Sequence, residues 1–81
     1  MSNEIVRLSE LNKGEVGEIV GYEKSIPSSI RSKILSMGLT RGVRVEMIRP
    51  AIFGDPLEFR VRGFNLSLRK NEAQYVLVKK V

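Results

Sequence analysis

Apolar and polar side chains alternate along most of the chain, which is the pattern of short β-strands with one buried face. The stretches with this character are residues 5–8, 15–22, 43–48, 57–62, 64–69 and 75–79. Turn-forming residues separate them, as expected for strands joined by tight links. The sequence therefore predicts a mainly β protein with five to six short strands.

One segment departs from this period of two. Residues 28–37 carry Ile30, Ile34 and Met37 at helical spacing, so they predict the one α-helix of normal length. Its apolar stripe would lie against the sheet. Short strands with a single helix describe a small β-barrel, and we expect residues 1–81 to form one domain.

Several small residues predict local geometry. Ser28 or Ser29 can cap the first amides of the helix, and Gly38 is a natural C-terminal stop. Gly38, Gly54 and Gly63 lack any surrounding phosphate-binding pattern, so we interpret them as turn residues with unusual backbone angles. No nucleotide site is predicted from them.

The strand at residues 15–22 has a distinctive face. Gly17, Ile19 and Gly21 lie together on one side of its pleat, where small residues permit bending or close approach. Elsewhere, regularly spaced apolar residues usually belong to the core. We predict a core role, in preference to a recognition stripe, for Met37, Leu39, Leu66 and Leu68.

Residues 50–56 hold two prolines, a glycine and an aspartate, and therefore predict a loop. Pro56 ends it immediately before the next strand pattern. The loop also contains Ile52 and Phe53, two apolar side chains that either fold back into the core or form an exposed interface. The sequence leaves both interpretations open.

The net charge of +5 is unevenly distributed. Residues 1–23 carry five acids and two bases, whereas residues 24–81 carry four acids and twelve bases. The basic part could face an acidic protein, a nucleic acid or a membrane surface. Four of its residues are candidates for partner binding, with a solvated surface as the alternative: Arg60, Arg62, Arg69 and Lys70.

The chain contains no histidine and no cysteine. It therefore lacks disulfides, thiolate metal ligands and the commonest general base, and we expect no enzyme activity. Hard oxygen ligands remain, and Asp55, Glu58 and Glu72 are the candidates for a weak ferrous iron site; no other cofactor is expected. No apolar run approaches the roughly 18 residues of a spanning helix, so a cytoplasmic location without membrane insertion is expected.

Three motifs in order carry a family resemblance: SMGLT at residues 36–40, GDP at 54–56 and VRGFNLSLRK at 61–70. Together they resemble the ferrous iron transport protein A family over nearly the whole chain. Six positions within them are structural motif positions: Met37, Gly38, Leu39, Gly54, Pro56 and Gly63.

The resemblance implies an SH3-like barrel in the cytoplasm that assists a ferrous iron membrane transporter with a cytosolic GTPase domain. The expected function is a protein–protein interaction module that binds or regulates that transporter. A related SH3-like domain ends some iron-dependent repressors, so a metal-responsive regulatory domain is one alternative. A nucleic-acid-binding barrel is the other, although the chain has few aromatic residues for base stacking and no nucleic-acid partner is expected.

Overall fold

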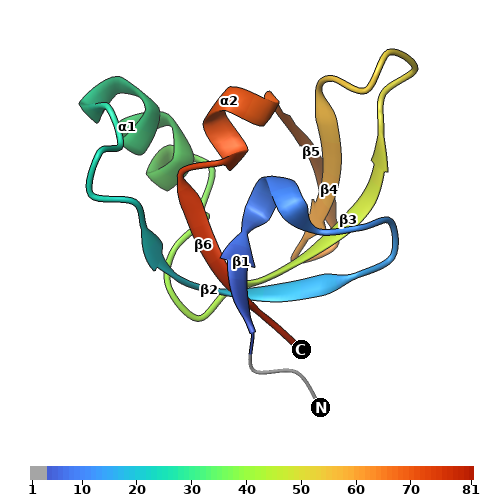
Figure 1. Cartoon of the computed structure of the whole chain (residues 1–81), viewed down its shortest axis with the longest axis horizontal. Coiled ribbons are helices and arrows are strands. Elements are labelled where there is room, and N and C mark those ends of the chain that lie inside the picture. The colour runs from blue at the N-terminus through green and yellow to red at the C-terminus, as the bar shows by residue number, and fades with distance from the viewer. Residues whose placement is uncertain (1–3) are drawn as a thin grey trace.

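The computed structural model describes residues 4–81 as a small sheet with helices packed on it (Figure 1). In chain order the elements are β1 (Ile5–Arg7), a 3-10 turn (Leu8–Glu10), β2 (Val16–Tyr22), α1 (Ser28–Ser36), β3 (Arg44–Pro50), β4 (Leu57–Val61), β5 (Phe64–Leu68), α2 (Lys70–Ala73) and β6 (Val76–Lys80). The predicted mainly β class, the six strands and the helix near residues 28–37 are confirmed. Neither helix in this part of the chain has the length and apolar character needed to span a membrane.

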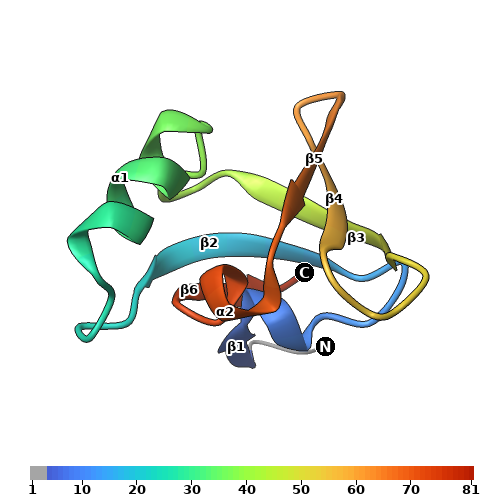
Figure 2. The ribbon, with the colours of Figure 1, turned by 90° about the horizontal axis from the view of Figure 1, so that it is seen from above.

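All six strands belong to one antiparallel sheet in the order β1-β6-β2-β3-β4-β5. The sheet curls strongly, so that the two views in Figures 1 and 2 show a barrel-like shape. β1 and β5 are the two edges and do not pair with each other. The first and last strands lie side by side because Ile5 pairs with Lys79. Figure 1 shows the loop between β3 and β4 at the opposite end of the molecule.

The inward faces of the strands and one side of α1 form a single apolar core. Its fully buried side chains include Leu8, Ile19, Val45, Phe59, Val76 and Val78. The predicted core residues Leu39 and Leu68 are buried, and Met37 and Leu66 pack against the core with partial exposure. No polar or charged side chain is buried within residues 4–81. Burial of apolar surface is therefore the main stabilising contribution to this fold.

The glycine face of β2, where small residues were predicted to permit bending or close approach, is turned toward the core. Gly17, Ile19 and Gly21 are all buried, and the register between β2 and β6 shifts between Ile19 and Gly21. Such an irregularity bends a strand and increases its twist. The small residues thus allow β2 to curve while β6 packs closely on it.

The N-terminal cap of α1 differs from the prediction, whereas its C-terminal stop agrees with it. Pro27 occupies the N-cap position in an extended conformation and no side chain caps the helix, so the predicted Ser28 or Ser29 cap is wrong. The reason is that the helix starts directly after the proline, which places both serines inside the first turn. Gly38 ends the helix with φ +80°, as predicted.

The C-terminal end of α1 has the hydrogen bonds of a Schellman motif. The Leu39 N–H donates to the Ile34 carbonyl at 3.2 Å, and the Gly38 N–H donates to the Leu35 carbonyl at 3.0 Å. The Tyr22 hydroxyl also donates to the Leu39 carbonyl at 2.6 Å. These contacts turn the chain sharply and bury Leu39 beneath the helix.

Candidate functional site

The loop at residues 51–56, between β3 and β4, presents apolar side chains to solvent. Ile52 is 94% exposed and Phe53 is 96% exposed. The turn that lifts them is closed by the Gly54 N–H, which donates to the Ala51 carbonyl at 2.8 Å while Gly54 adopts φ +86°. The structure rules out the folded-back interpretation of Ile52 and Phe53, whereas their role in an interface stays a prediction. The predicted turn role of Gly54 is confirmed.

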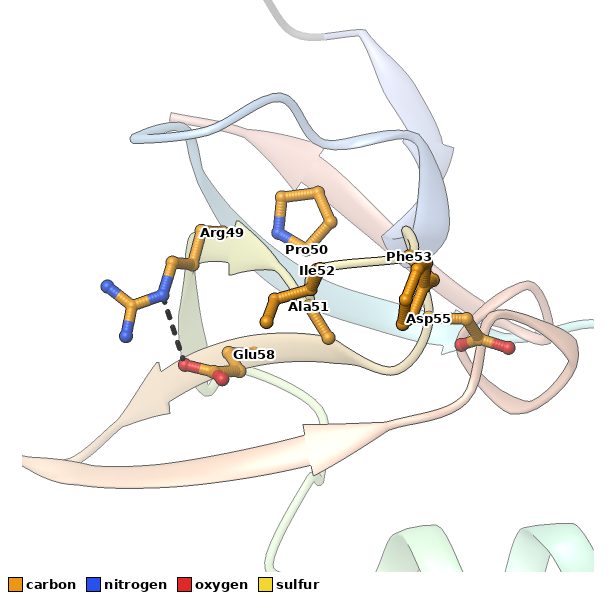
Figure 3. A pocket seen from close by; sticks show the side chains of 7 residues that line it. All are labelled: Arg49, Pro50, Ala51, Ile52, Phe53, Asp55 and Glu58. Carbon is orange, nitrogen blue, oxygen red and sulfur yellow. Dashed lines mark ion pairs between the residues drawn. The ribbon is translucent and has the colours of Figure 1, made fainter.

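An open groove of about 530 Å³ lies along this loop and the adjoining strand ends (Figure 3). Its lining residues are Arg49, Pro50, Ala51, Ile52, Phe53, Asp55 and Glu58. At one end Arg49 Nε lies 3.6 Å from Glu58 Oε1, and Phe53 stands at the other. The groove therefore combines an apolar floor with a charged end, which suits a protein segment better than a small polar metabolite.

The loop is anchored to α2 through Asp55. Its Oδ1 accepts a hydrogen bond from the Lys70 backbone N–H at 3.0 Å. The Lys70 ammonium lies close by, since a Cβ built on Gly54 would be 3.6 Å from Lys70 Nζ. A cation thus lies beside the exposed apolar pair. Of the six residues predicted to bind a partner, the fold brings together Ile52, Phe53 and Lys70.

The three predicted arginines lie elsewhere. Arg60 is on the outer face of β4, where its Nε donates to Asn65 Oδ1 at 3.4 Å. Arg69 is exposed immediately before α2. The prediction that Arg62 lies on a strand face is wrong, because β4 ends at Val61 and Arg62 occupies the following turn with φ +51°.

The turn at Arg62 and Gly63 explains that difference. Two residues with positive φ, +51° and +82°, form a type I′ hairpin turn, the geometry that matches the twist of the strands on either side. The predicted turn role of Gly63 is confirmed. The Arg62 side chain reaches toward α1, since its Nη1 would lie 3.2 Å from a Cβ built on Gly38.

The three carboxylates predicted for a weak metal site are not assembled into one. Asp55 accepts the Lys70 N–H, Glu58 faces Arg49, and Glu72 Oε2 accepts a hydrogen bond from Lys33 Nζ at 2.7 Å. Residues 4–81 contain no group of three histidine, cysteine or acidic side chains arranged to hold a metal ion. The donor set present therefore does not fit a metal centre.

The Glu72 carboxylate has a structural role that the sequence did not reveal. The hydrogen bond from Lys33 is the main cause that holds the pKa of Glu72 below its ordinary value, against the opposing effect of burial; the Arg69 backbone N–H adds to the lowering. Lys33 belongs to α1 and Glu72 to α2. Their ion pair joins the two helices.

Sequence reasoning also missed part of the groove. Arg49, Pro50 and Ala51 line it but were not singled out, and Glu58 was assigned to a metal site and not to this groove. The available signal was the Arg49-Pro50 pair at the end of a strand pattern, since a proline there marks the point where ladder pairing stops. That signal locates a loop boundary and does not reveal a groove.

The sequence model of the FeoA domain matches residues 6–80. The chain belongs to the FeoA domain family. This confirms the resemblance drawn from the motifs at residues 36–40, 54–56 and 61–70.

A curated relative from Porphyromonas gingivalis, the Fe(2+) transport protein A/Fe(2+) transporter FeoB fusion protein, is 34% identical over 74 residues. The match covers 91% of this chain and 8% of that protein, so the FeoA chain spans less than a tenth of its relative's length. In that relative, a FeoA-like segment and a ferrous iron transporter form one polypeptide. The family is thereby associated with ferrous iron transport.

Solved structures confirm the fold. The FeoA-like protein from Clostridium acetobutylicum is 35% identical with a TM-score of 0.85, over 96% of this chain and 88% of that one. The FeoA of Stenotrophomonas maltophilia, described as a prokaryotic SH3 domain protein and solved with zinc, is 25% identical with a TM-score of 0.78, over 90% and 88% of the two chains. The predicted SH3-like fold is thus confirmed.

The same fold occurs in a different class of protein. A manganese-dependent transcriptional repressor superposes with a TM-score of 0.84 at 15% identity, over all of this chain and 44% of the repressor. At that identity the likeness shows the fold alone. The FeoA assignment therefore depends on the family match and the closer relatives.

Proposed function

We propose that this FeoA protein is a cytoplasmic accessory protein of ferrous iron uptake that binds the cytosolic portion of a GTPase-coupled ferrous iron transporter. The observation that carries the proposal is the fusion relative, in which an FeoA-like segment and the transporter FeoB share one chain. Two modules joined in this way meet at high effective concentration, which favours modules that act together. The chain would modulate the transporter by contact and not by catalysis.

The surface that best suits this contact is the groove at residues 49–58. Ile52 and Phe53 are almost fully exposed, and exposed apolar residues next to a concave surface are typical of protein-binding sites. Arg49 and Lys70 are balanced by Glu58 and Asp55 on the same surface, so the exposed apolar pair is expected to contribute most of the affinity. Phe53 is the expected anchor residue.

The test is a binding measurement between the purified chain and the cytosolic portion of the ferrous iron transporter from the same organism. Phe53→Ala is expected to weaken binding at least about tenfold, as for a hot-spot residue, without unfolding the protein. The matched control is Ile5→Ala, which removes an apolar side chain that is 58% exposed on β1, far from the groove, and should leave binding unchanged. Failure of the wild-type chain to bind would refute the proposal, and equal binding by the Phe53 variant would refute the assigned surface.

The two alternatives raised by the sequence predict different results in the same assay. A nucleic-acid-binding barrel would retain labelled single-stranded DNA or RNA on a filter, with an affinity that falls steeply as salt increases. A metal-responsive regulatory domain would change its affinity for the transporter when ferrous iron is added. The proposed function predicts neither effect.

A further inference from the structure

The free edge of β5 is a second surface, besides the groove at residues 49–58, that could bind a partner. β5 pairs with β4 on one side and has no strand on the other. Figure 2 shows the β4–β5 hairpin extending away from the rest of the fold. Three of its five residues, Phe64, Asn65 and Ser67, are exposed. β5 is thus an accessible edge strand.

The backbone groups of this edge are unpaired in a regular pattern. Because the hairpin turn has two residues, Val61 and Phe64 form a hydrogen-bonded pair, and the pairing then alternates along the ladder. The N–H and C=O groups of Asn65 and Ser67 therefore point away from β4. Within residues 4–81, these groups have no backbone or side-chain hydrogen-bond partner. They form the template that an added strand requires.

The side chains of β5 specify what kind of strand would fit. Phe64 and Leu66 lie on the same face as the buried Val61 and Phe59, yet Phe64 remains 74% exposed. A neighbouring strand with apolar residues on that face would cover it. Asn65 and Ser67 lie on the opposite, polar face, so the incoming segment would alternate between apolar and polar side chains.

A positively charged residue lies at each end of β5, which favours an acidic partner. Arg62 precedes β5 and Arg69 follows it, and neither makes an ion pair among the described residues. No acidic residue lies between them in the sequence. An antiparallel second copy would place Arg62 of each chain near Arg69 of the other. This repulsion disfavours self-pairing, as charged residues on edge strands commonly do.

We propose that the β5 edge binds an extended acidic segment of a partner protein by strand addition. The segment would hydrogen-bond to Asn65 and Ser67, cover Phe64 with an apolar side chain, and place carboxylates near Arg62 and Arg69. This deepens the proposed function by naming the kind of segment that is bound. The β5 inference rests on the proposed function only in taking the transporter as the partner.

The first test uses a synthetic peptide as the probe. It alternates valine and threonine over five residues and has a glutamate at each end; a control peptide has lysine at each end. The amides of Asn65 and Ser67 in the full chain should become protected from hydrogen exchange when the glutamate peptide is added. The lysine peptide should bind at least about tenfold more weakly at low salt, and the difference should shrink at about 1 M salt. No protection at about 5 mM peptide would overturn the proposal.

Two variants separate strand addition from other modes of contact. Ser67→Pro removes an N–H that points away from β4, so the sheet is retained while the added strand loses a donor. Its matched control, Ser67→Ala, keeps the N–H. Peptide binding should fall at least about tenfold in the proline variant and stay unchanged in the alanine variant. Equal binding by both folded variants would refute strand addition, and a circular dichroism spectrum of each establishes that it is folded.

The same variants distinguish this inference from the proposed function. If the transporter's cytosolic portion binds wild type and Ser67→Pro equally, the β5 inference fails while the proposed function stands. If that portion binds neither, the proposed function fails, and the peptide experiment alone decides the inference. Protection of Asn65 and Ser67 that increases with protein concentration and without peptide would show a second copy at the edge, which contradicts the proposal.

Discussion

Gly17 of β2 packs against Val78 of β6 so closely that a Cβ on Gly17 would lie 2.7 Å from Val78 Cγ2. Such a separation is too short for two carbon atoms, and both sites lie in the core. The absence of a side chain at Gly17 is what lets the two strands curl together. The register between β2 and β6 shifts between Ile19 and Gly21, further along the same strand.

Gly17→Ala should therefore destabilise the protein by about 1–3 kcal/mol, the usual cost of overpacking a core. Chemical denaturation monitored by circular dichroism measures the change in the free energy of unfolding. The matched control is Gly21→Ala in the same strand, where the nearest atom is the flexible Arg41 Nη2 at 3.8 Å. The control should change stability by no more than about 0.5 kcal/mol. Equal costs at the two sites would contradict the close-packing explanation.

Two phenylalanines separated by six positions should respond in opposite ways to truncation. Phe53 is 96% exposed and Phe59 is fully buried. Phe53→Ala should change the free energy of unfolding by less than about 0.5 kcal/mol, whereas Phe59→Ala should cost about 3–5 kcal/mol. Thermal denaturation of the two variants provides the comparison. A large loss of stability in the Phe53 variant would mean that the loop packs on the core.

The hairpin turn provides a test of backbone strain alone. Gly63 has φ +82°, and a Cβ there would meet nothing within 4 Å. Gly63→Ala should cost about 1–2 kcal/mol, because an L-residue disfavours this conformation. Gly63→Asn should cost less, since asparagine tolerates positive φ better than other side chains. If urea denaturation gives the same midpoint for alanine and glycine, the turn does not hold this conformation in solution.

Acid should weaken the link between α1 and α2. Because the folded-state pKa of Glu72 is lowered, chiefly by Lys33, the ionised pair contributes stability above the unfolded-state pKa of about 4.3. That contribution is lost as the pH falls below this value and through the lowered folded-state pKa. Glu72→Gln should therefore be less stable than wild type at about pH 7, and the difference should shrink toward about pH 3.

Lys33→Gln is the companion variant for that experiment, since it removes the other partner of the same ion pair. Its free energy of unfolding should depend less on pH than that of the wild type, as for Glu72→Gln. Stability measured by urea denaturation at a series of pH values tests both variants. A pH dependence identical to that of the wild type in both would show that the Lys33–Glu72 pair does not form in solution.

Local pattern predicted the elements well because their causes are local. Alternation located the strands, and the glycines with positive φ located the turns, since few other residues adopt those angles. Arg62 is the exception: it shares the alternating pattern of β4, but the preference of a two-residue hairpin for positive φ takes it out of the strand. The predicted Ser28 or Ser29 cap was wrong because Pro27 is the N-cap residue and the helix already begins at Ser28.

The site was only partly predictable because its causes are distant in sequence. The exposure of Ile52 and Phe53 depends on a loop anchored by Asp55 to Lys70, fifteen positions away. The carboxylate of Glu72 is engaged by Lys33, thirty-nine positions away, which removes it from any metal site. Composition and spacing do not reveal such pairs. The partner-binding roles of the arginines stay predictions.

The pairing of Ile5 with Lys79 has a consequence for how this domain can be tethered. The start of β1 and the end of β6 lie next to each other and away from the loop between β3 and β4, as Figure 1 shows. A polypeptide joined through that side would begin at the end of the molecule opposite the loop between β3 and β4. Covalent tethering raises the local concentration of a partner to about the millimolar range, so weak contacts suffice in a fused protein. A domain without such a tether must hold its partner by the affinity of its own surface.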